Sequence, residues 1–253
     1  MRRTKRFASF ALAACMGVSL LVNVPAGTVS AAELEETLSA EATETDAELL
    51  NEGQEALSDR VTDENGFVWE GTRLIKYVGN SGNVIIPTKC TEIADGAFMF
   101  NTNLVSVKIP AGVTRVGQGA FWGCSRLTGI ELPAEVTSIG PSAFNQCSGL
   151  EKIVVDPENK TYNSNGDCNA IIKTATNTLI WGCKNTRIPT DVIRIGSGAF
   201  SNCSGLTSIE IPASVTEIGD AFDNCSGLTN IEIPASVTKI ESGAFSNCSG
   251  LEK

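Results

Sequence analysis

Short runs of alternating apolar and polar residues recur along the chain from about residue 66 onward. In residues 206–211, LTSIEI, the two isoleucines lie two positions apart and the glutamate between them points the other way, as in a strand with one buried face. Pro212 ends this run, because proline has no N–H to donate to a neighbouring strand. A second apolar pair, Val215 and Ile218, predicts another short extended segment after the proline.

An Ala-Phe pair marks each repetition of this pattern. The units share the form Leu-x-x-Ile-x-Ile-Pro-x-x-Val-Thr-x-Ile-Gly-x-x-Ala-Phe-x-x-Cys-Ser-x, and the phenylalanines are spaced by 23, 23, 56, 22 and 23 residues. The long interval fits one ordinary unit and one unit with a ten-residue insertion. Each unit has an apolar side that it cannot bury alone, so we expect the units to stack with parallel strands along one face. The phenylalanines are Phe98, Phe121, Phe144, Phe200, Phe222 and Phe245.

This motif resembles the BspA-like subclass of leucine-rich repeats, and its 22–23-residue period lies within the leucine-rich-repeat range. The resemblance covers residues 66–253, about three quarters of the chain. It implies an α/β repeat solenoid, with parallel β-strands on one face and short strand or helical turns on the other. Residues 65–90 resemble the N-terminal cap and first unit of such an array, and residues 65–253 form the predicted solenoid domain.

Two departures from the pattern are visible. The unit at 156–186 lacks Ala-Phe and carries residues 159–183 in its place, for which we predict an inserted β-hairpin. The chain also stops inside a unit at Leu251-Glu252-Lys253, so we expect a fragment or a truncated member of a longer protein.

The N-terminus has the pattern of an export signal in residues 1–32. Four basic residues precede an apolar run from Phe7 to Val24, and small residues follow, which predicts cleavage near Ala31-Ala32. A transmembrane anchor is the alternative, since about 18 apolar residues is a borderline length for one. Lipoprotein processing at Cys15 is a second alternative, although the run after it stays apolar.

The acidity of the chain is concentrated behind this signal. Residues 33–64 hold twelve acidic residues and one basic residue, and they have no aromatic residue. Such a segment buries little apolar surface, so we predict a disordered acidic spacer, with a marginal helix as the alternative. The formal charge of −10 argues against nucleic acid as a partner, because phosphate binding needs clustered Lys and Arg.

The residue types needed for catalysis are scarce. The chain has no histidine, which excludes Ser-His-Asp and Cys-His catalysis and removes the commonest ligand of transition metals. Acidic pairs such as Asp156 with Glu158 and Asp220 with Asp223 lie in predicted turns, where solvated surface is the simpler interpretation than a glycosidase site. We therefore expect no enzymatic activity, no cofactor and no metal.

One position of the repeat is occupied by cysteine or asparagine. We interpret it as a column of buried side chains that satisfy the turn backbone, since leucine-rich repeats commonly use Asn or Cys there. A zinc or redox site is the rival interpretation, but metal ligands converge on one point, whereas these side chains advance one unit at a time. The column consists of Asn101, Cys124, Cys147, Cys203, Cys225 and Cys248. Cys168 and Cys183 flank the insertion instead, and we hypothesise that they form a disulfide across it.

Two surfaces are candidates for binding. The outward strand position of successive units forms a predicted stripe on the strand face, where solenoids usually bind, with solubility as the alternative role. The stripe consists of Lys108, Glu131, Val154, Arg187, Glu210 and Glu232. The inserted loop is the second candidate, because insertions in repeats often map to the binding face. Its residues are Tyr162, Asn163, Asn165 and Trp181, although Trp181 has packing on the solenoid flank as an alternative.

The resemblance implies a bacterial protein, secreted or at the cell surface, that works by adhesion. We expect a non-enzymatic extracellular binding protein whose partner is a host matrix protein or a protein of another cell, without membrane insertion once the signal is cleaved. The alternative is an accessory or glycan-binding module of a larger secreted enzyme or envelope protein. A purely structural role in the envelope is a third hypothesis.

Overall fold

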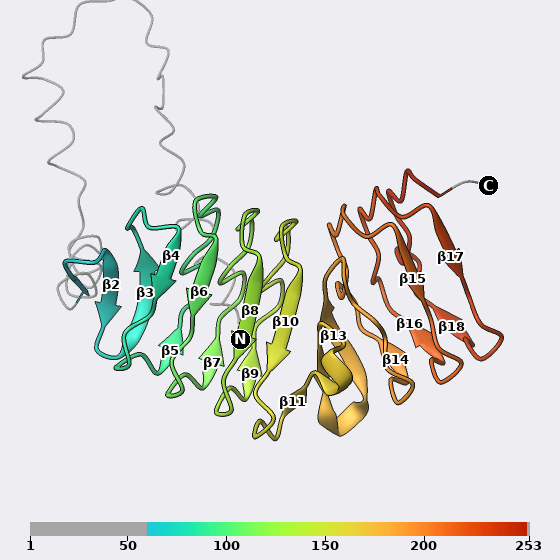
Figure 1. The fold of residues 1–253 in the computed structure, drawn as a ribbon, viewed down its shortest axis with the longest axis horizontal. Coiled ribbons are helices and arrows are strands. Elements are labelled where there is room, and N and C mark those ends of the chain that lie inside the picture. Colours follow the sequence, from blue (N-terminus) through green and yellow to red (C-terminus); the bar gives the residue numbers. More distant parts are fainter. Residues whose placement is uncertain (1–59, 252–253) are drawn as a thin grey trace, which may run out of the picture. The chain divides into compact units, whose positions relative to one another are not determined.

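The computed structural model describes residues 60–251. The predicted signal peptide (1–32) and residues 33–59 of the predicted spacer lie outside the described residues. Within residues 60–251 the chain winds into successive coils, each of which adds short strands to the strands of the coil before it (Figure 1).

The fold begins with an antiparallel cap. Strands β1 (Arg60–Thr62), β2 (Phe67–Glu70) and β3 (Arg73–Tyr77) pair in this order. The Asp63 carboxylate accepts hydrogen bonds from the backbone N–H of Phe67 at 3.0 Å and from the indole N–H of Trp69 at 2.8 Å, which fixes the turn between β1 and β2. Arg60–Thr62 fall within the predicted spacer, so the ordered fold starts before the predicted boundary at residue 65.

Each ordinary coil contributes two strands, one before its proline and one after its Val-Thr pair. The strands before the proline form the first-strand sheet, with parallel pairing such as Ile85 with Lys108. Its members are β4 (Asn83–Ile85), β6 (Ser106–Lys108), β8 (Gly129–Leu132) and β10 (Lys152–Val155). The strands after Val-Thr continue from β3 as the second-strand sheet. They are β5 (Glu92–Ile93), β7 (Arg115–Val116) and β9 (Ser138–Ile139).

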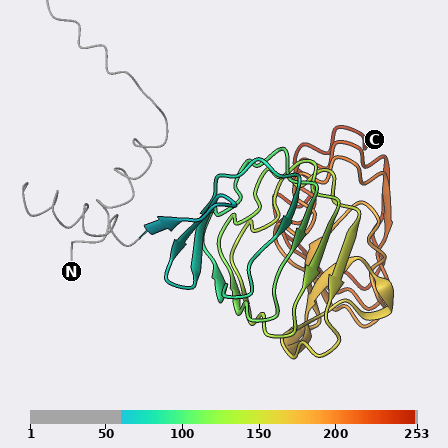
Figure 2. The same ribbon diagram turned by 60° about the vertical axis from the view of Figure 1, so that its left-hand side comes forward.

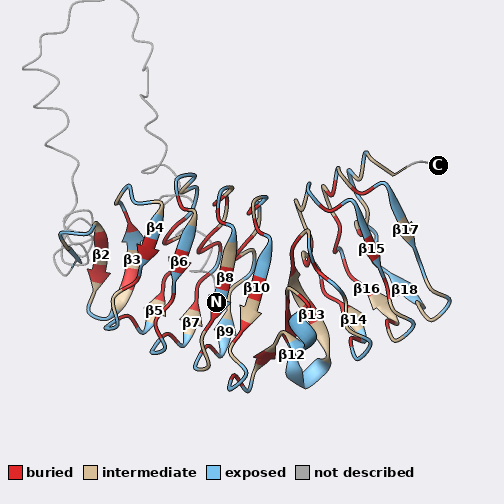
Figure 3. Cartoon of the chain, in the orientation of Figure 1, coloured by how far each residue is buried: buried red, intermediate tan, exposed pale blue. Residues whose placement is uncertain are grey.

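The core inside the coils contains a column of phenylalanine rings. Figure 3 colours the buried segments of each coil red. The ring centroids of Phe98 and Phe121 are 5.0 Å apart, and those of Phe121 and Phe144 are 5.5 Å apart. The same nearly parallel stacking joins Phe200 to Phe222 at 5.0 Å. Aromatic pairs at this separation add stabilisation beyond the burial of their area, so each coil is held by the coils on both sides of it.

The described residues contain no α-helix. Two short 3₁₀ turns, η1 (Asn165–Asp167) and η2 (Thr174–Thr176), are the helical elements present, and both lie in the insertion. The predicted α/β class and the helical turns are therefore wrong for residues 60–251. The physical reason is that the segments between strands are interrupted by glycine, proline and left-handed residues, which leaves no uninterrupted length for an α-helix.

The insertion forms a hairpin that is built into the stack. Strand β11 (Tyr162–Asn163) pairs with β12 (Ala170–Lys173), which pairs antiparallel with β13 (Thr178–Gly182). In β12, Ile171 belongs to the core of the preceding coils and Ile172 to the core of the following coils. The hairpin therefore packs on both halves of the solenoid, and Figure 2 shows it in yellow and orange between the green and red coils.

The coils resume after the insertion as a second pair of sheets. Strand β13 continues in parallel pairing to β14 (Arg194–Ile195), β16 (Glu217–Ile218) and β18 (Lys239–Ile240). Strands β15 (Ser208–Glu210) and β17 (Asn230–Glu232) form a separate parallel pair. The first-strand sheet that ends at β10 is therefore not continuous with β15.

The phenylalanine column predicts a position-dependent cost of truncation. Phe121→Ala should lower the free energy of unfolding by about 3–5 kcal/mol, because it leaves a cavity between two stacked rings. Phe245→Ala is the matched control, since Phe245 stacks on Phe222 but is only half-buried in the last described coil, and its loss should be smaller. Urea denaturation followed by circular dichroism measures both, and equal losses would contradict the column as the main stabilising element.

Candidate functional site

The structure divides the predicted stripe into two rows. Lys108, Glu131 and Val154 occupy the outward positions of β6, β8 and β10, and the backbone register places Val154 directly beside Glu131. Glu210 and Glu232 are opposite each other on β15 and β17. The two rows lie in different sheets, so the stripe is not one line.

Arg187 lies between the two rows but in no strand. Its backbone N–H donates to the carbonyl of Cys168 in the insertion at 2.9 Å, and its side chain is exposed. In a regular coil, the backbone N–H of this residue would bond to the preceding first strand, β10. Here it bonds to the insertion, so the first-strand sheet stops at β10.

Ile85 belongs to the first row but is absent from the sequence prediction. It pairs in register with Lys108, and its side chain is 72% exposed. The tetrapeptide Val84-Ile85-Ile86-Pro87 has the repeat's pattern of a strand before proline, which is a signal that could have identified it. The first row therefore runs Ile85, Lys108, Glu131, Val154.

Shallow hollows follow this row and join it to the insertion. A hollow of about 670 Å³ extends from Ile85 past Lys108 and Glu131 to Asp156. A smaller one of about 280 Å³ lies over Gly129, between Glu131, Lys152 and Val154. A third of about 440 Å³ is lined by Val154, Asp156 and the loop residues Tyr162, Asn163 and Asn165. Because they share Glu131, Val154 and Asp156, we treat them as one surface and call it the first-strand hollow.

The insertion side of the first-strand hollow is fixed by hydrogen bonds. The Ser164 hydroxyl accepts the backbone N–H of Val155 at 2.9 Å, which ties the loop to β10. Asn163 donates its side-chain amide to the Thr174 hydroxyl at 3.2 Å. Tyr162 is buried, while Asn163 is half-buried and Asn165 is exposed. The structure thus brings three of the four predicted loop residues together with Val154 of the stripe.

Trp181, the fourth loop residue, lies apart from the hollow in the aromatic column. Its ring meets the ring of Phe144 edge-on with a centroid separation of 5.8 Å, and a side chain on Gly182 would overlap the ring of Phe200. Gly182 takes the backbone position of the missing phenylalanine, since its N–H donates to the carbonyl of Ala199 at 2.8 Å, as that of Phe121 does to Ala143. Trp181, which precedes it, is half-buried and packs on the end of the first part of the column.

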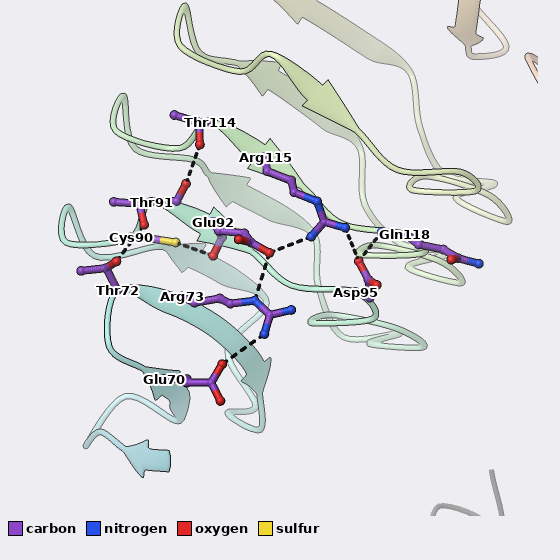
Figure 4. A network of polar contacts seen from close by, with 10 residues as sticks. All are labelled: Glu70, Thr72, Arg73, Cys90, Thr91, Glu92, Asp95, Thr114, Arg115 and Gln118. Atoms are coloured by element: carbon purple, nitrogen blue, oxygen red, sulfur yellow. Dashed lines mark hydrogen bonds and ion pairs between the residues drawn. The ribbon is translucent and has the colours of Figure 1, made fainter. Parts of the chain in front are cut away.

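Charges on the second-strand sheet neutralise one another, unlike those in the first row. Glu92 accepts hydrogen bonds from Arg73 at 3.0 Å and from Arg115 at 2.7 Å, and Arg115 also pairs with Asp95 at 2.9 Å (Figure 4). Among residues 60–251, Lys108 and Glu131 make no ion pair, and Glu210 and Glu232 are like charges in adjacent strands. Like charges across a strand pair are destabilising, so Glu210 and Glu232 do not serve the fold.

The cysteine column lies inside the coils and bonds each coil to the one before it. Four thiols donate to the carbonyl of the preceding coil's phenylalanine at 3.1 Å: Cys124, Cys147, Cys225 and Cys248. Asn101, in the first coil of the column, instead accepts the backbone N–H of Asn103 at 3.2 Å. Cys203 lies in the coil after the inserted unit, which has no phenylalanine in the column. The Cys203 thiol is half-buried.

Burial keeps these thiols protonated. Loss of solvent raises the pKa of Cys124, Cys203 and Cys225 to about 12, and burial also raises the pKa of Cys147. A thiol needs a lowered pKa to act as a nucleophile or redox centre, so the column is chemically inert at neutral pH.

Cys168 and Cys183 are both buried, and their sulfur atoms lie beside the carbonyls of Ala170 and Asn169. The disulfide between them stays a prediction. Across the described part of the chain, no three Cys, Asp or Glu side chains are grouped so that they could hold a metal ion. Asp156, considered above for acid chemistry, accepts the backbone N–H of Glu158 at 2.9 Å and so caps a turn.

Coils with two parallel strands each, stacked on a common phenylalanine column, define a leucine-rich-repeat β-solenoid. Residues 74–178 and 179–253 match the family model described as BspA type leucine rich repeat region, six copies. The chain belongs to this family.

Three solved structures illustrate the similarity. A leucine rich cell surface protein from Faecalibacterium prausnitzii is 30% identical, with a TM-score of 0.44, over 67% of this chain and 58% of that one. A leucine rich repeat protein of T. pallidum is 26% identical, with a TM-score of 0.48, over 77% and 87%. One from Eubacterium ventriosum is 22% identical, with a TM-score of 0.48, over 76% and 68%. The chain thus spans little more than half of the Faecalibacterium protein.

No curated protein was found to match the chain. Within residues 60–251 there is also no helix of the length and apolar character needed to cross a membrane.

The thiol column predicts a loss of stability in alkali. An unfolded thiol ionises near pH 8.5, whereas the folded Cys225 holds its proton to about pH 12, so unfolding releases a proton above pH 8.5 and becomes easier as pH rises. Cys225→Ser keeps a donor for the Phe200 carbonyl but has no titrating group. Between pH 8 and pH 10 its free energy of unfolding should fall by about 2 kcal/mol less than that of the wild type.

Urea denaturation at the two pH values measures this difference. Cys248→Ser is the control, because Cys248 donates the same bond from a half-buried position and should change the pH dependence less. An identical pH dependence in the wild type and Cys225→Ser would show that the buried thiol does not carry the effect.

Proposed function

We propose that this chain is a non-enzymatic, adhesin-like binding protein that acts outside the bacterial cell, and that a partner protein binds at the first-strand hollow. The observation that carries the proposal is the first row itself: an outward row of apolar and oppositely charged side chains that the fold leaves unpaired and that runs directly into the inserted loop. The family and the predicted export signal agree with this role.

The chemistry of the row suits a protein surface. Ile85 is an exposed apolar side chain at one end, and Val154 is half-buried at the other. Between them lie the cation of Lys108 and the carboxylate of Glu131, neither of which forms an ion pair with residues 60–251. Protein interfaces combine apolar anchors with complementary charges that fix orientation and speed association. On the second-strand sheet, Arg73 and Arg115 are already engaged by Glu92, so that face has less to offer a partner.

The inserted loop supports the same location. It is tied to β10 by the bond between Val155 and Ser164, so its polar residues are already held beside Val154 before a partner arrives. A surface ordered in advance loses less conformational entropy on binding. The half-buried Asn163 and exposed Asn165 therefore extend the recognition surface beyond the strands.

Binding rather than catalysis fits the groups that line the hollow. It contains Lys108, Lys152 and carboxylates such as Glu131 and Asp156, but the lining has no thiol, and the chain has no histidine. The hollow is shallow and open across three strands, whereas catalytic sites use enclosed clefts with convergent polar groups.

A solid-phase assay tests the proposal with the full chain against immobilised fibronectin, fibrinogen, laminin and collagen. We expect saturable binding to at least one of them. Lys108→Ala and Glu131→Ala should each raise the Kd about five- to tenfold, and the association should weaken with added salt. The matched control is Lys76→Ala, an exposed lysine on β3 of the second-strand sheet, which should leave the Kd unchanged.

The results separate the competing locations and functions. Glu210→Ala and Glu232→Ala should have little effect, because these residues lie in the other row. Loss of binding only in the Glu210 and Glu232 variants would move the site away from the proposed hollow. Binding to none of the four proteins, or binding unaffected by Lys108→Ala and Glu131→Ala, would contradict the proposal and favour the accessory-module or structural role.

A further inference from the structure

A second exposed surface departs from the repeat, at the turn that follows each column phenylalanine. The two residues after the phenylalanine are polar in the later coils: Asn145-Gln146, Ser201-Asn202, Asp223-Asn224 and Ser246-Asn247. In the first two coils they are Met99-Phe100 and Trp122-Gly123. We call Met99, Phe100 and Trp122 the turn patch.

Phe100 adopts a backbone conformation that does not suit it. Its φ is +56°, in the left-handed region, and the equivalent residues Asn202, Asn224 and Asn247 have φ between +57° and +62°. Asparagine tolerates this region, whereas a bulky side chain there is strained. The conformation is imposed by the stack, since the Phe100 N–H donates to the carbonyl of Trp122 at 2.6 Å. Asparagine at position 100 would adopt the same φ with less backbone strain. Folding therefore does not explain why this position is phenylalanine.

Glycines of the second coil make room for the patch. A Cβ on Gly123 would overlap the Phe100 ring, and a Cβ on Gly119 would lie 3.1 Å from the Met99 methyl and 3.4 Å from the Trp122 ring. The Phe100 and Trp122 centroids are 6.1 Å apart with the rings tilted by 41°. The two rings thus form a seated aromatic pair, and Phe100 is still 61% exposed.

The next residues along the ridge carry no charge. They are Asn145 and Gln146, while the carboxylate of Asp95, which precedes the first of these turns, is occupied by Arg115 at 2.9 Å. The indole N–H of Trp122 is buried with no acceptor among the described residues, which is a further cost that folding does not require. An exposed aromatic pair beside neutral amides has no charge with which to attract an ionic ligand.

We propose that the turn patch is a binding platform for a neutral saccharide. A sugar ring has one face of C–H groups, whose positive edges are attracted to the negative face of an aromatic ring, and a rim of hydroxyls that amides can bind. The apolar face lies on Phe100 and Trp122, and the hydroxyls meet Asn145 and Gln146. The platform is separate from the first-strand hollow, so it adds a second class of ligand to the proposed protein binding.

The test uses the full chain with five neutral probes: cellohexaose, xylohexaose, mannohexaose, maltohexaose and chitohexaose. Titration followed by calorimetry and by tryptophan fluorescence should show binding of at least one probe with a Kd of about 1 mM. Phe100→Asn and Trp122→Ser should each raise that Kd roughly tenfold, the effect of one aromatic contact. Asn224→Gln, at the same turn position in a distant coil, is the control and should bind as the wild type does.

Phe100→Asn also separates this proposal from a structural role. It installs the residue that other coils use at this position, so the melting temperature should stay the same or rise while saccharide binding falls. A lower melting temperature in Phe100→Asn, no binding of any probe, or binding equal in all variants would overturn the proposal. So would concentration-dependent self-association that Phe100→Asn abolishes, since a second copy would then be the occupant.

Lys108→Ala and Glu131→Ala leave the turn patch intact, so failure of either proposal is recognised independently.

Discussion

The apolar interior of each coil is one strand spacing thick along the solenoid axis, so it is dry only when a similar coil covers it on each side. This constraint explains why the same residue type returns at the same place. Each phenylalanine ring stacks on the ring of the previous coil, and the thiol three residues after it donates to the carbonyl of that previous phenylalanine, as Cys124 does to Phe98. The backbone bonds between coils then fix φ at the turn, whichever side chain occupies it. Sequence variation is free only where a side chain points outward.

The insertion meets the same constraint in a different way. Its strand β12 buries Ile171 on one side and Ile172 on the other, so a hairpin stands in for the covering surface of a regular coil. Trp181 supplies an aromatic ring to the column, although edge-on. Each of the two core clusters is thereby covered by the hairpin, but strand continuity on the other face is lost, because Arg187 bonds to the hairpin rather than to β10. The first-strand hollow ends at the insertion for this reason, and the loop becomes one of its walls.

Much of this could be read from the repeat, because periodicity specifies which side chains share a position in successive coils. The column cysteines and the outward residues Lys108, Glu131 and Val154 follow directly from it. What periodicity could not give is the geometry of the unit that breaks it. The split of the stripe, the position of Trp181 and the surroundings of Cys168 and Cys183 depend on how the hairpin packs. The α/β class was wrong for a related reason. The resemblance to leucine-rich repeats implied helical turns between the strands. In this chain, glycine, proline and left-handed residues at those positions favour two-residue strands and tight turns instead.

Departures from the repeat are the places where function can be separated from folding. At an inward position, the coils before and after dictate the residue, so its identity carries little information about ligands. At an outward position the fold accepts almost any polar residue, and a choice that costs stability needs another cause. The strained, exposed Phe100 is such a choice, whereas Lys108 and Glu131 are charges that no ion pair within residues 60–251 engages. They differ in what they offer, since the strand row presents charge and the turn patch presents an uncharged aromatic surface. One scaffold therefore has room for two chemically distinct contacts, because its two exposed surfaces, strand and turn, vary independently while the core stays constant.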